Sequence, residues 1–357
     1  MRLRLRTWVA LAVLSMVLIG LWLFFRPTGT YQTLACERHE LTHNGQPVIG
    51  VEDMAYDERN EQIYLSAYDR RDGKSGGVYT LNKNNSLERF LLPNTETQAY
   101  WPHGLHLSHQ NNQTRLDVIE RDLQVKGQQK ARISQYRWNA AEPNDIQLVK
   151  RTEDELFCSA NNLIFTTSDT NPKGLYITRD QHSCDIGQQK WDNIFNPKSS
   201  SLLYMQDSAS DIATAMDKLS YANGVAPHPT NGVYISETRA KRLRHRRLRS
   251  EKLFPNESFG NVKLAGGPDN LTVTSQGDIL AALHPNLIRF AAFRAGWGSR
   301  VKSRFAIIAP DKSVKTYDVP ANIMSGATVA LKVDKSVYLG GAFDNGIAIC
   351  DLGAPHE

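Results

Sequence analysis

Short apolar segments recur along the chain, and each follows a polar or glycine-containing pair by ten to fourteen residues. These segments are rich in Val, Ile and Tyr and are bounded by Gly, Asn and Asp, which is typical of strands rather than of helical repeats. They begin near Ile63, Leu116, Leu175, Val233, Ile279 and Val337. The preceding pairs are Glu52-Asp53, His103-Gly104, Asn161-Asn162, Asn223-Gly224, Asp269-Asn270 and Gly326-Ala327. Six units of this kind predict an all-β, six-bladed β-propeller.

Length and charge support one such domain, at residues 27–357, after a separate segment at residues 1–26. A formal charge of +5 is modest for 357 residues, and the basic residues are not interleaved with aromatic ones, so nucleic acid is not an expected partner. The exception is the basic run from Lys241 to Arg249. We expect it to form a solvated outer strand or hairpin of the fourth blade, with binding of lipid headgroups as the alternative.

The N-terminal segment predicts where the protein resides. Thr7 to Phe25 is an uncharged apolar run preceded by Arg2, Arg4 and Arg6, which predicts a transmembrane helix with a cytoplasmic N-terminus. No small-x-small cleavage site closes the run, so an uncleaved anchor is expected rather than a removed signal peptide. The propeller would then lie on the extracytoplasmic side of a membrane, in a periplasmic, extracellular or lumenal compartment.

Four cysteines agree with an oxidising compartment. Cys36 precedes the first repeat and Cys350 follows the last, where a bridge would fasten the two ends of a closed ring. Cys158 and Cys184 could form a second bridge within the third blade, or remain two buried thiols. The sequence alone does not choose among the three possible pairings of four cysteines.

The repeat brings oxygen-bearing side chains together. In a propeller the innermost strands surround a central channel, so residues at the same position of successive units converge there. Two of the converging residues are carboxylates and three are amides. This set suits a hard cation, and calcium better than magnesium or zinc. The alternative is that each residue merely caps a turn. The converging residues are Glu52, Asn161, Asn223, Asp269 and Asn270.

Two histidines are candidates for moving protons. His103, in WPHGLHL, falls at the position of the proposed ligands, so it should overlook the channel mouth and act as a general base. His284, in LHPN, is predicted to end the inner strand of the fifth blade.

Several segments resemble, in the same order, those of the paraoxonase/arylesterase family of calcium-dependent lactonases. The similarity extends over most of the chain beyond the N-terminal apolar segment, and it includes the paired terminal cysteines. The segments are GVEDMAYD, WPHGLHL, SANNLIF, YANGVAP, GPDNLTV, ALHPN, SGATVA and IAIC.

The resemblance implies roles for individual residues. His103 matches the first of two proposed catalytic histidines, but Arg121 stands near the second, and an arginine cannot relay a proton. His284 and Asp180 match residues near the substrate at the channel mouth. Asn162 stands where the family commonly has an aspartate, which should weaken the second, structural ion. The catalytic calcium ligands would be Glu52, Asn161, Asn223, Asp269 and Asn270, and the structural site would use Asp53, Asn162 and the carbonyl of Leu105.

The resulting hypothesis is calcium-dependent hydrolysis of lactones or aryl esters, with calcium as the electrophile and His103 as the base. Arg121 could stabilise an oxyanion or bind an anionic group of the substrate. Two alternatives stand beside it: a calcium-stabilised propeller that binds ligands without turnover, and an enzyme of the gluconolactonase or strictosidine-synthase type. The oligomeric state is not indicated by the sequence.

Overall fold

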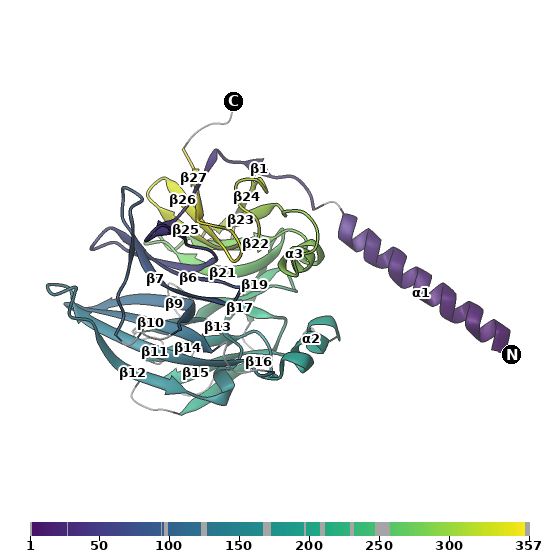
Figure 1. The fold of residues 1–357 in the computed structure, drawn as a ribbon, viewed down its shortest axis with the longest axis horizontal. Helices are drawn as coiled ribbons and strands as arrows, with labels where there is room; N and C mark the ends of the chain where they lie inside the picture. Colours follow the sequence, from purple (N-terminus) through teal and green to yellow (C-terminus); the bar gives the residue numbers. More distant parts are fainter. Residues whose placement is uncertain are drawn as a thin grey trace.

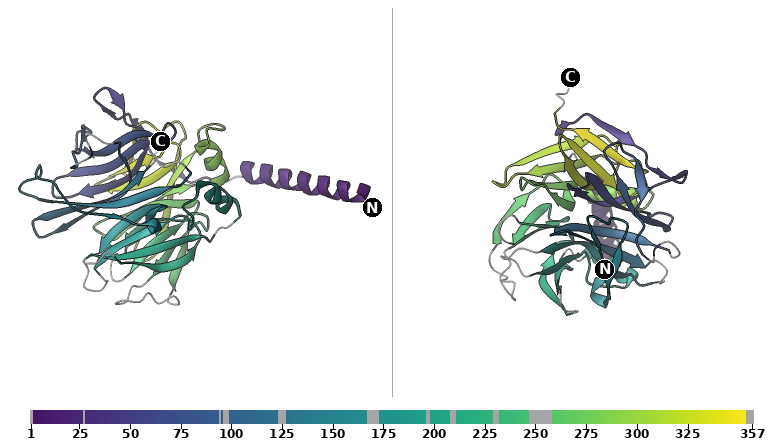
Figure 2. Two further views of the ribbon diagram at one scale, coloured as in Figure 1. Left: turned by 60° about the horizontal axis from the view of Figure 1, so that its bottom comes forward. Right: turned by 90° about the vertical axis from the view of Figure 1, so that its left-hand side faces the viewer.

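In the computed structural model, six sheets surround a central axis and one long helix projects from one face (Figures 1 and 2). The structure describes residues 2–26, 28–93, 95, 99–122, 127–166, 173–195, 198–207, 211–228, 232–246 and 258–353. Successive inner strands contact one another around the ring. The predicted six-bladed β-propeller is therefore confirmed.

Each blade is an antiparallel sheet whose strands run outward from the axis in chain order. The inner strands are β5 (Val51–Asp57), β9 (Trp101–Gln110), β13 (Ala160–Thr166), β17 (Ala222–Pro227), β21 (Gly267–Val273) and β25 (Ala327–Val333). The second strands are β6 (Gln62–Asp69), β10 (Gln113–Asp122), β14 (Gly174–Arg179), β18 (Val233–Glu237), β22 (Ile279–His284) and β26 (Ser336–Gly341). The third strands are β7 (Lys74–Leu81), β11 (Lys130–Asn139), β15 (Ser200–Gln206), β19 (Arg242–Arg246), β23 (Ser303–Ile308) and β27 (Ile347–Asp351). The outer strands of the first five blades are β8 (Leu87–Arg89), β12 (Gln147–Glu153), β16 (Ile212–Leu219), β20 (Ser258–Lys263) and β24 (Val314–Val319).

The N-terminal part of the domain closes the ring. Strand β2 (Cys36–His39) completes the sixth blade by pairing antiparallel with β27, with Cys36 opposite Cys350, and these two residues form the expected disulfide. Strand β1 (Gln32–Thr33) adds to the fifth blade in parallel with β24, and β3 (Thr42–His43) and β4 (Gln46–Pro47) form a small hairpin. Residues from both ends of the chain therefore share the last blade.

The apolar core lies between neighbouring blades. One cluster joins Val51 and Leu65 of the first blade to Val329 and Ile347 of the sixth. Burying a side chain of this size contributes about 1.5–3 kcal/mol. Because each blade packs against two others, the whole ring fixes the positions of the inner strands.

The inner strands are bulged at their polar pairs. In the third blade Ala160 faces Arg179 and Leu163 faces Ile177, so two residues stand opposite Thr178 alone. Comparable register shifts occur in the first, second, fourth, fifth and sixth blades. A β-bulge bends a strand and redirects side chains, so the repeated pair marks a repeated distortion.

The helices lie on one face of the ring (Figures 1 and 2). They are α1 (Arg2–Phe25), α2 (Ile186–Phe195), which follows the third blade's β14, and α3 (Leu287–Arg294), which follows β22; a short 3-10 helix, η1, covers Glu155–Phe157. Within the described part of the chain, no helix is both long and apolar enough to cross a membrane. The predicted transmembrane anchor is thus not supported.

Two placements refine the sequence interpretation. His284 ends β22, the second strand of its blade, and not the inner strand as predicted, because the bulged polar pair occupies the inner one. The basic run contributes β19, a third strand, where Arg242 and Arg244 bond to the buried Glu237 at 2.5 and 2.8 Å. The rest of the run, from residue 247, lies outside the described residues.

Candidate active site

The bulges are held by hydroxyl groups of the second strands. Ser236 accepts from the Gly224 backbone at 2.6 Å and donates to the carbonyl of Asp269 in the next blade at 2.7 Å. Thr178 accepts from the Asn162 backbone and donates to the carbonyl of Asn223. These links tie each bulge to its neighbour, so the side chains that project into the channel are positioned as a set.

Four of the predicted ligand oxygens are buried: among the described residues three of them have no hydrogen-bond partner, and the fourth, Glu52 Oε2, lies 3.1 Å from the Arg70 guanidinium. Each atom without a partner costs about 1–3 kcal/mol unless something satisfies it. The four oxygens come from the inner strands of the first, third, fourth and fifth blades, and the four side chains are 4–5% exposed. Among the described residues, no three His, Cys, Asp or Glu side chains cluster as metal ligands, but this set draws two of its four oxygens from amides. A hard cation fits these donors. The atoms are Glu52 Oε2, Asn161 Oδ1, Asn223 Oδ1 and Asp269 Oδ1.

The fifth predicted ligand, Asn270, belongs to a hydrogen-bonded group beneath them. Its Nδ2 donates to the carbonyl of Glu52 at 2.9 Å, and its Oδ1 accepts from Asn162 at 3.1 Å. Asn162 also donates to Asp53 at 2.8 Å, and the backbone of Leu105 donates to the same oxygen at 2.9 Å. Burial raises the pKa of Asp53 well above its usual value. Asn162 and the Leu105 backbone thus both donate to Asp53, and the predicted structural ion stays a prediction.

His103 is enclosed by charged groups. Its Nδ1 lies 3.1 Å from Nη2 of Arg70, and its Nε2 lies 3.6 Å from Glu52 Oε1. A guanidinium only donates, so Nδ1 is the acceptor and the hydrogen of the neutral ring sits on Nε2. Burial, together with the positive charge of Arg121 and other arginines, lowers the pKa of His103 well below its usual value. The ring is therefore neutral near pH 7 and presents an N–H group rather than a lone pair.

His284 carries its hydrogen on the same nitrogen but has different partners. Its Nε2 lies 2.7 Å from Asp269 Oδ2, and its ring stacks on Phe290 at 3.7 Å between centroids. An ionised carboxylate only accepts, so Nε2 carries the hydrogen and the Nδ1 lone pair is left to take a proton. A carboxylate orients the base histidine of hydrolytic triads in the same way. Asp269 thus offers one oxygen to His284 while the other has no partner.

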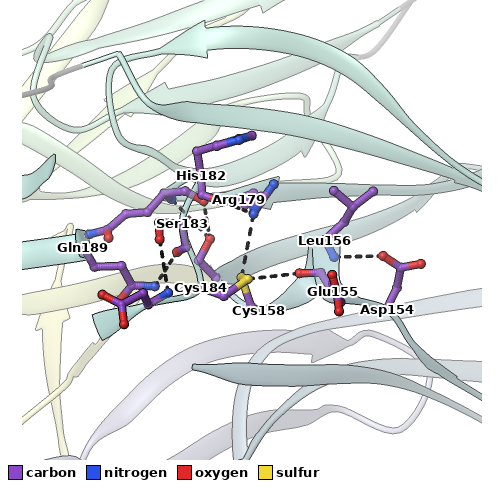
Figure 3. Close-up of a disulfide and its surroundings, with 12 residues drawn as sticks. Asp154, Glu155, Leu156, Cys158, Arg179, His182, Ser183, Cys184 and Gln189 are labelled. Carbon is purple, nitrogen blue, oxygen red and sulfur yellow. Dashed lines mark hydrogen bonds between the residues drawn. A yellow bond between two sulfur atoms is a disulfide. The ribbon is translucent and has the colours of Figure 1, made fainter. Parts of the chain in front are cut away.

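A disulfide joins the two ends of the segment from which the third blade contributes Asn161 and Asp180 to the site. Cys158 and Cys184 are bonded, which resolves the alternative that the sequence left open (Figure 3). Between them, Asn161 Nδ2 donates to Asp180 Oδ2 at 3.3 Å. This bond fixes the amide of Asn161 with its oxygen turned away from Asp180. Burial raises the pKa of Asp180, although the charge of Arg121 opposes the shift.

Two cavities lie at different ends of the channel. The larger, about 560 Å³, is lined by Asp53, Asn162 and residues toward the ends of the inner strands. The smaller, about 270 Å³, lies on the helix face and is lined by His284, Phe290 and Phe24 among others. The larger cavity is also lined by His106, whereas the smaller contains His284, the histidine that bonds to Asp269.

Sequence reasoning missed residues that come from outside the inner strands. Arg70 follows β6, and Arg294 ends α3, where its side chain bonds to Tyr221. For three residues at the channel mouth the position in the repeat was a signal. Arg121, Asp180 and His284 each lie two positions after the second-strand residue that faces the bulge of the inner strand. Those facing residues are Ile119, Thr178 and Ala282.

Comparisons with known proteins identify the fold. No protein-family model matches the sequence, and no curated protein matches it. Among solved structures, a gluconolactonase from Xanthomonas campestris superposes with a TM-score of 0.54 at 16% identity, over 92% of this chain and 99% of that one. A luciferin-regenerating enzyme gives 0.53 at 12% identity over 90% and 96% of the two chains. The calcium-binding protein regucalcin from Agrobacterium tumefaciens gives 0.50 at 14% identity, over 92% and 98%.

At these identities the similarity shows a shared six-bladed propeller fold. The structural neighbours include gluconolactonase and regucalcin, and membership of the paraoxonase family stays a prediction.

Proposed function

We propose that the protein hydrolyses lactones or related carboxylic esters with the help of a calcium ion at the channel mouth. Four buried oxygens, three of them without a partner among the described residues and the fourth paired with Arg70, lie beside a histidine oriented by Asp269 and carry this proposal. The similarity to a gluconolactonase supports a lactone as the substrate, and the donor chemistry supports calcium. An enzyme of gluconolactonase type, rather than a paraoxonase in particular, is the form that these observations favour.

Each residue then has a defined role. Glu52, Asn161, Asn223 and Asp269 would hold the ion, which when bound would polarise the substrate carbonyl. His284 takes a proton from the attacking water, whose oxygen bonds to the carbonyl carbon. His103 donates its Nε2–H to the carbonyl oxygen as negative charge develops. The acyl C–O bond then breaks, and the proton on His284 passes to the departing alkoxide to give an acid and an alcohol.

This proposal changes the role of His103 from base to hydrogen-bond donor. Arg70 occupies the Nδ1 lone pair of His103, whereas no described contact occupies Nδ1 of His284. Proton transfer therefore falls to the histidine that the sequence treated as secondary.

The test is hydrolysis of phenyl acetate and of γ- and δ-lactones by the full chain, with calcium, after chelation, and after calcium is restored. We expect turnover to disappear on chelation and to return. Asn223→Ala should raise the calcium concentration needed for activity at least tenfold, while Asn112→Ala, on an exposed turn, should not. Turnover that survives chelation would contradict the proposal. Stabilisation by calcium without turnover would favour the non-catalytic binding module.

A further inference from the structure

Arginines from three separate elements lie near Glu52 and His103. Arg70 follows the second strand of the first blade, and Arg121 lies near the end of β10 in the second. Arg294 ends α3, which reaches across the mouth to the first blade, where Arg71 donates to the carbonyl of Phe293 at 3.0 Å. The charges of all three arginines act on Glu52 and His103, so the guanidinium groups lie close to one another.

Only one of these arginines is engaged as a counter-ion. Arg70 pairs with Glu52 at 3.1 Å and is further held by the carbonyl of Gly50 at 2.8 Å. Within the described residues, Arg121 and Arg294 form no salt bridge. Arg121 bonds to the carbonyl of Ala160 at 3.2 Å, and its Nε is buried without a hydrogen-bond partner. A buried guanidinium donor without an acceptor is unfavourable unless a bound group supplies one.

The charges at the mouth do not balance once a cation is present. The carboxylates of Glu52, Asp180 and Asp269 offset the three arginines one for one. The carboxylate of Asp53 beside them offsets part of a divalent cation, which still leaves an excess of positive charge at the mouth. A neutral lactone would leave this excess uncompensated, whereas an anionic substrate would offset it.

We propose that Arg121 and Arg294 form a recognition site for an anionic oxygen group, so that the substrates are lactones or esters that carry a carboxylate. This rests on the proposed hydrolase function and specifies its substrate class. The planar guanidinium matches a carboxylate with two parallel hydrogen bonds, which a neutral substituent cannot accept equally well. Arg121 lies on the rigid sheet and Arg294 on the helix across the mouth, so the anionic group would be held between them.

The first test compares substrates that differ only in charge. 4-Acetoxybenzoate and its neutral methyl ester share the reacting acetate, and 5-oxotetrahydrofuran-2-carboxylate and its methyl ester share the lactone ring. The measured quantity is the ratio of kcat/KM for the anionic over the neutral member. We expect wild-type protein to favour the anion, and Arg121→Gln and Arg294→Gln each to lower the ratio tenfold to a hundredfold, about the range for a charged hydrogen bond.

Two further variants act as controls. Arg121→Lys keeps the charge and should retain part of the preference. Arg59→Gln removes the same charge from an exposed turn beyond β5, at the opposite end of the inner strand from Glu52, and should leave the ratio unchanged. Equal ratios in wild type, Arg121→Gln and Arg294→Gln would overturn the inference.

A binding measurement separates failure of this inference from failure of the hydrolase function. Calorimetric titration of the full chain compares 4-hydroxybenzoate with neutral 4-hydroxybenzamide, with and without calcium. We expect the anion to bind at least tenfold more tightly, and Arg294→Gln to remove the difference. Such binding without any turnover would sustain the anion site and refute hydrolysis. Equal affinity for the two compounds would refute the anion site whatever the enzyme hydrolyses.

Discussion

His103 and His284, the two histidines of the candidate site, differ in the partners of their ring nitrogens. His284→Ala should lower kcat for phenyl acetate by about 10²- to 10⁴-fold, the range for loss of a general base. His103→Gln should lower it by only about tenfold, because an amide can still donate to the carbonyl oxygen. Both variants are compared at saturating calcium, with thermal unfolding as the check that each is folded. A larger loss in His103→Gln than in His284→Ala would return the role of base to His103.

The proposed ligands could be predicted because they share one position in a repeat. Glu52, Asn161, Asn223 and Asp269 occupy the bulge of their blades, and a bulge leaves a pattern along the sequence. Arg294 could not be predicted in this way. It reaches the mouth from a helix inserted between the second and third strands of the fifth blade, a position that α2 also takes in the third blade but that the repeat of polar pair and strand does not include.

At the scale of an element, the bulges need glycine where neighbouring strands come closest. A Cβ at Gly224 would lie 2.7 Å from the Asp269 carbonyl oxygen and 2.8 Å from the Asn270 Cα, both on the next inner strand. We expect Gly224→Ala to destabilise the fold by about 2–3 kcal/mol through overpacking and to weaken stabilisation by calcium. Denaturant unfolding with and without calcium measures both effects. Gly353→Ala, where a Cβ meets only ordinary contacts, is the control, and equal stability of the two variants would show that β21 can move.

Strand β18 carries a buried acid that organises the basic third strand of its blade. Burial alone would raise the pKa of Glu237, but hydrogen bonds from Arg242, Arg244 and the Ser220 backbone outweigh it and lower the pKa. The folded state therefore binds this proton less readily than the unfolded chain. The stabilisation is present above the ordinary pKa and is lost as pH falls through the lowered one.

The corresponding variant is Glu237→Gln. It should be less stable than wild type by about 2–3 kcal/mol at pH 7, since it weakens two charge-assisted bonds to a buried group. The difference should shrink as pH falls from the ordinary pKa of a glutamate through the lowered pKa of the folded state, where wild type gains the proton. Urea unfolding from pH 7 to pH 3 measures it, with the exposed Glu61→Gln as a control that should change little. A constant difference across this range would rule out the ionised pair as its cause.

At the scale of the whole molecule, the repeat in the sequence predicted the number of blades. The closure of the ring could be predicted only from the positions of Cys36 and Cys350. Strand β2 is four residues long and offers no repeat signal of its own. Its partner is set by the register of the closed ring, in which Cys36 meets Cys350. His284 was placed on the wrong strand because a short apolar run does not show which strand of a blade it forms.

The two disulfides should therefore have different roles, one in stability and one in positioning the site. Cys36 and Cys350 are 314 residues apart, and a bridge across so long a loop stabilises by on the order of 5 kcal/mol in the chain-entropy model. Cys158 and Cys184 are 26 residues apart, which corresponds to about 3 kcal/mol. We expect Cys36→Ser with Cys350→Ser to lower the Tm more than Cys158→Ser with Cys184→Ser does. Below the transition, we expect the second pair to lower kcat/KM more, because its loop holds Asp180 against Asn161.

Calorimetry and steady-state rates on both double variants give the comparison. The ring-closing variant should lose stability while its remaining folded fraction keeps a near wild-type rate, since β2 lies at the outer edge of the sixth blade, far from the channel. The Cys158/Cys184 variant should instead need more calcium for half-maximal rate, because a looser Asp180 no longer fixes the amide of Asn161. If both variants lost rate in proportion to stability alone, the third-blade disulfide would have no part in positioning the site.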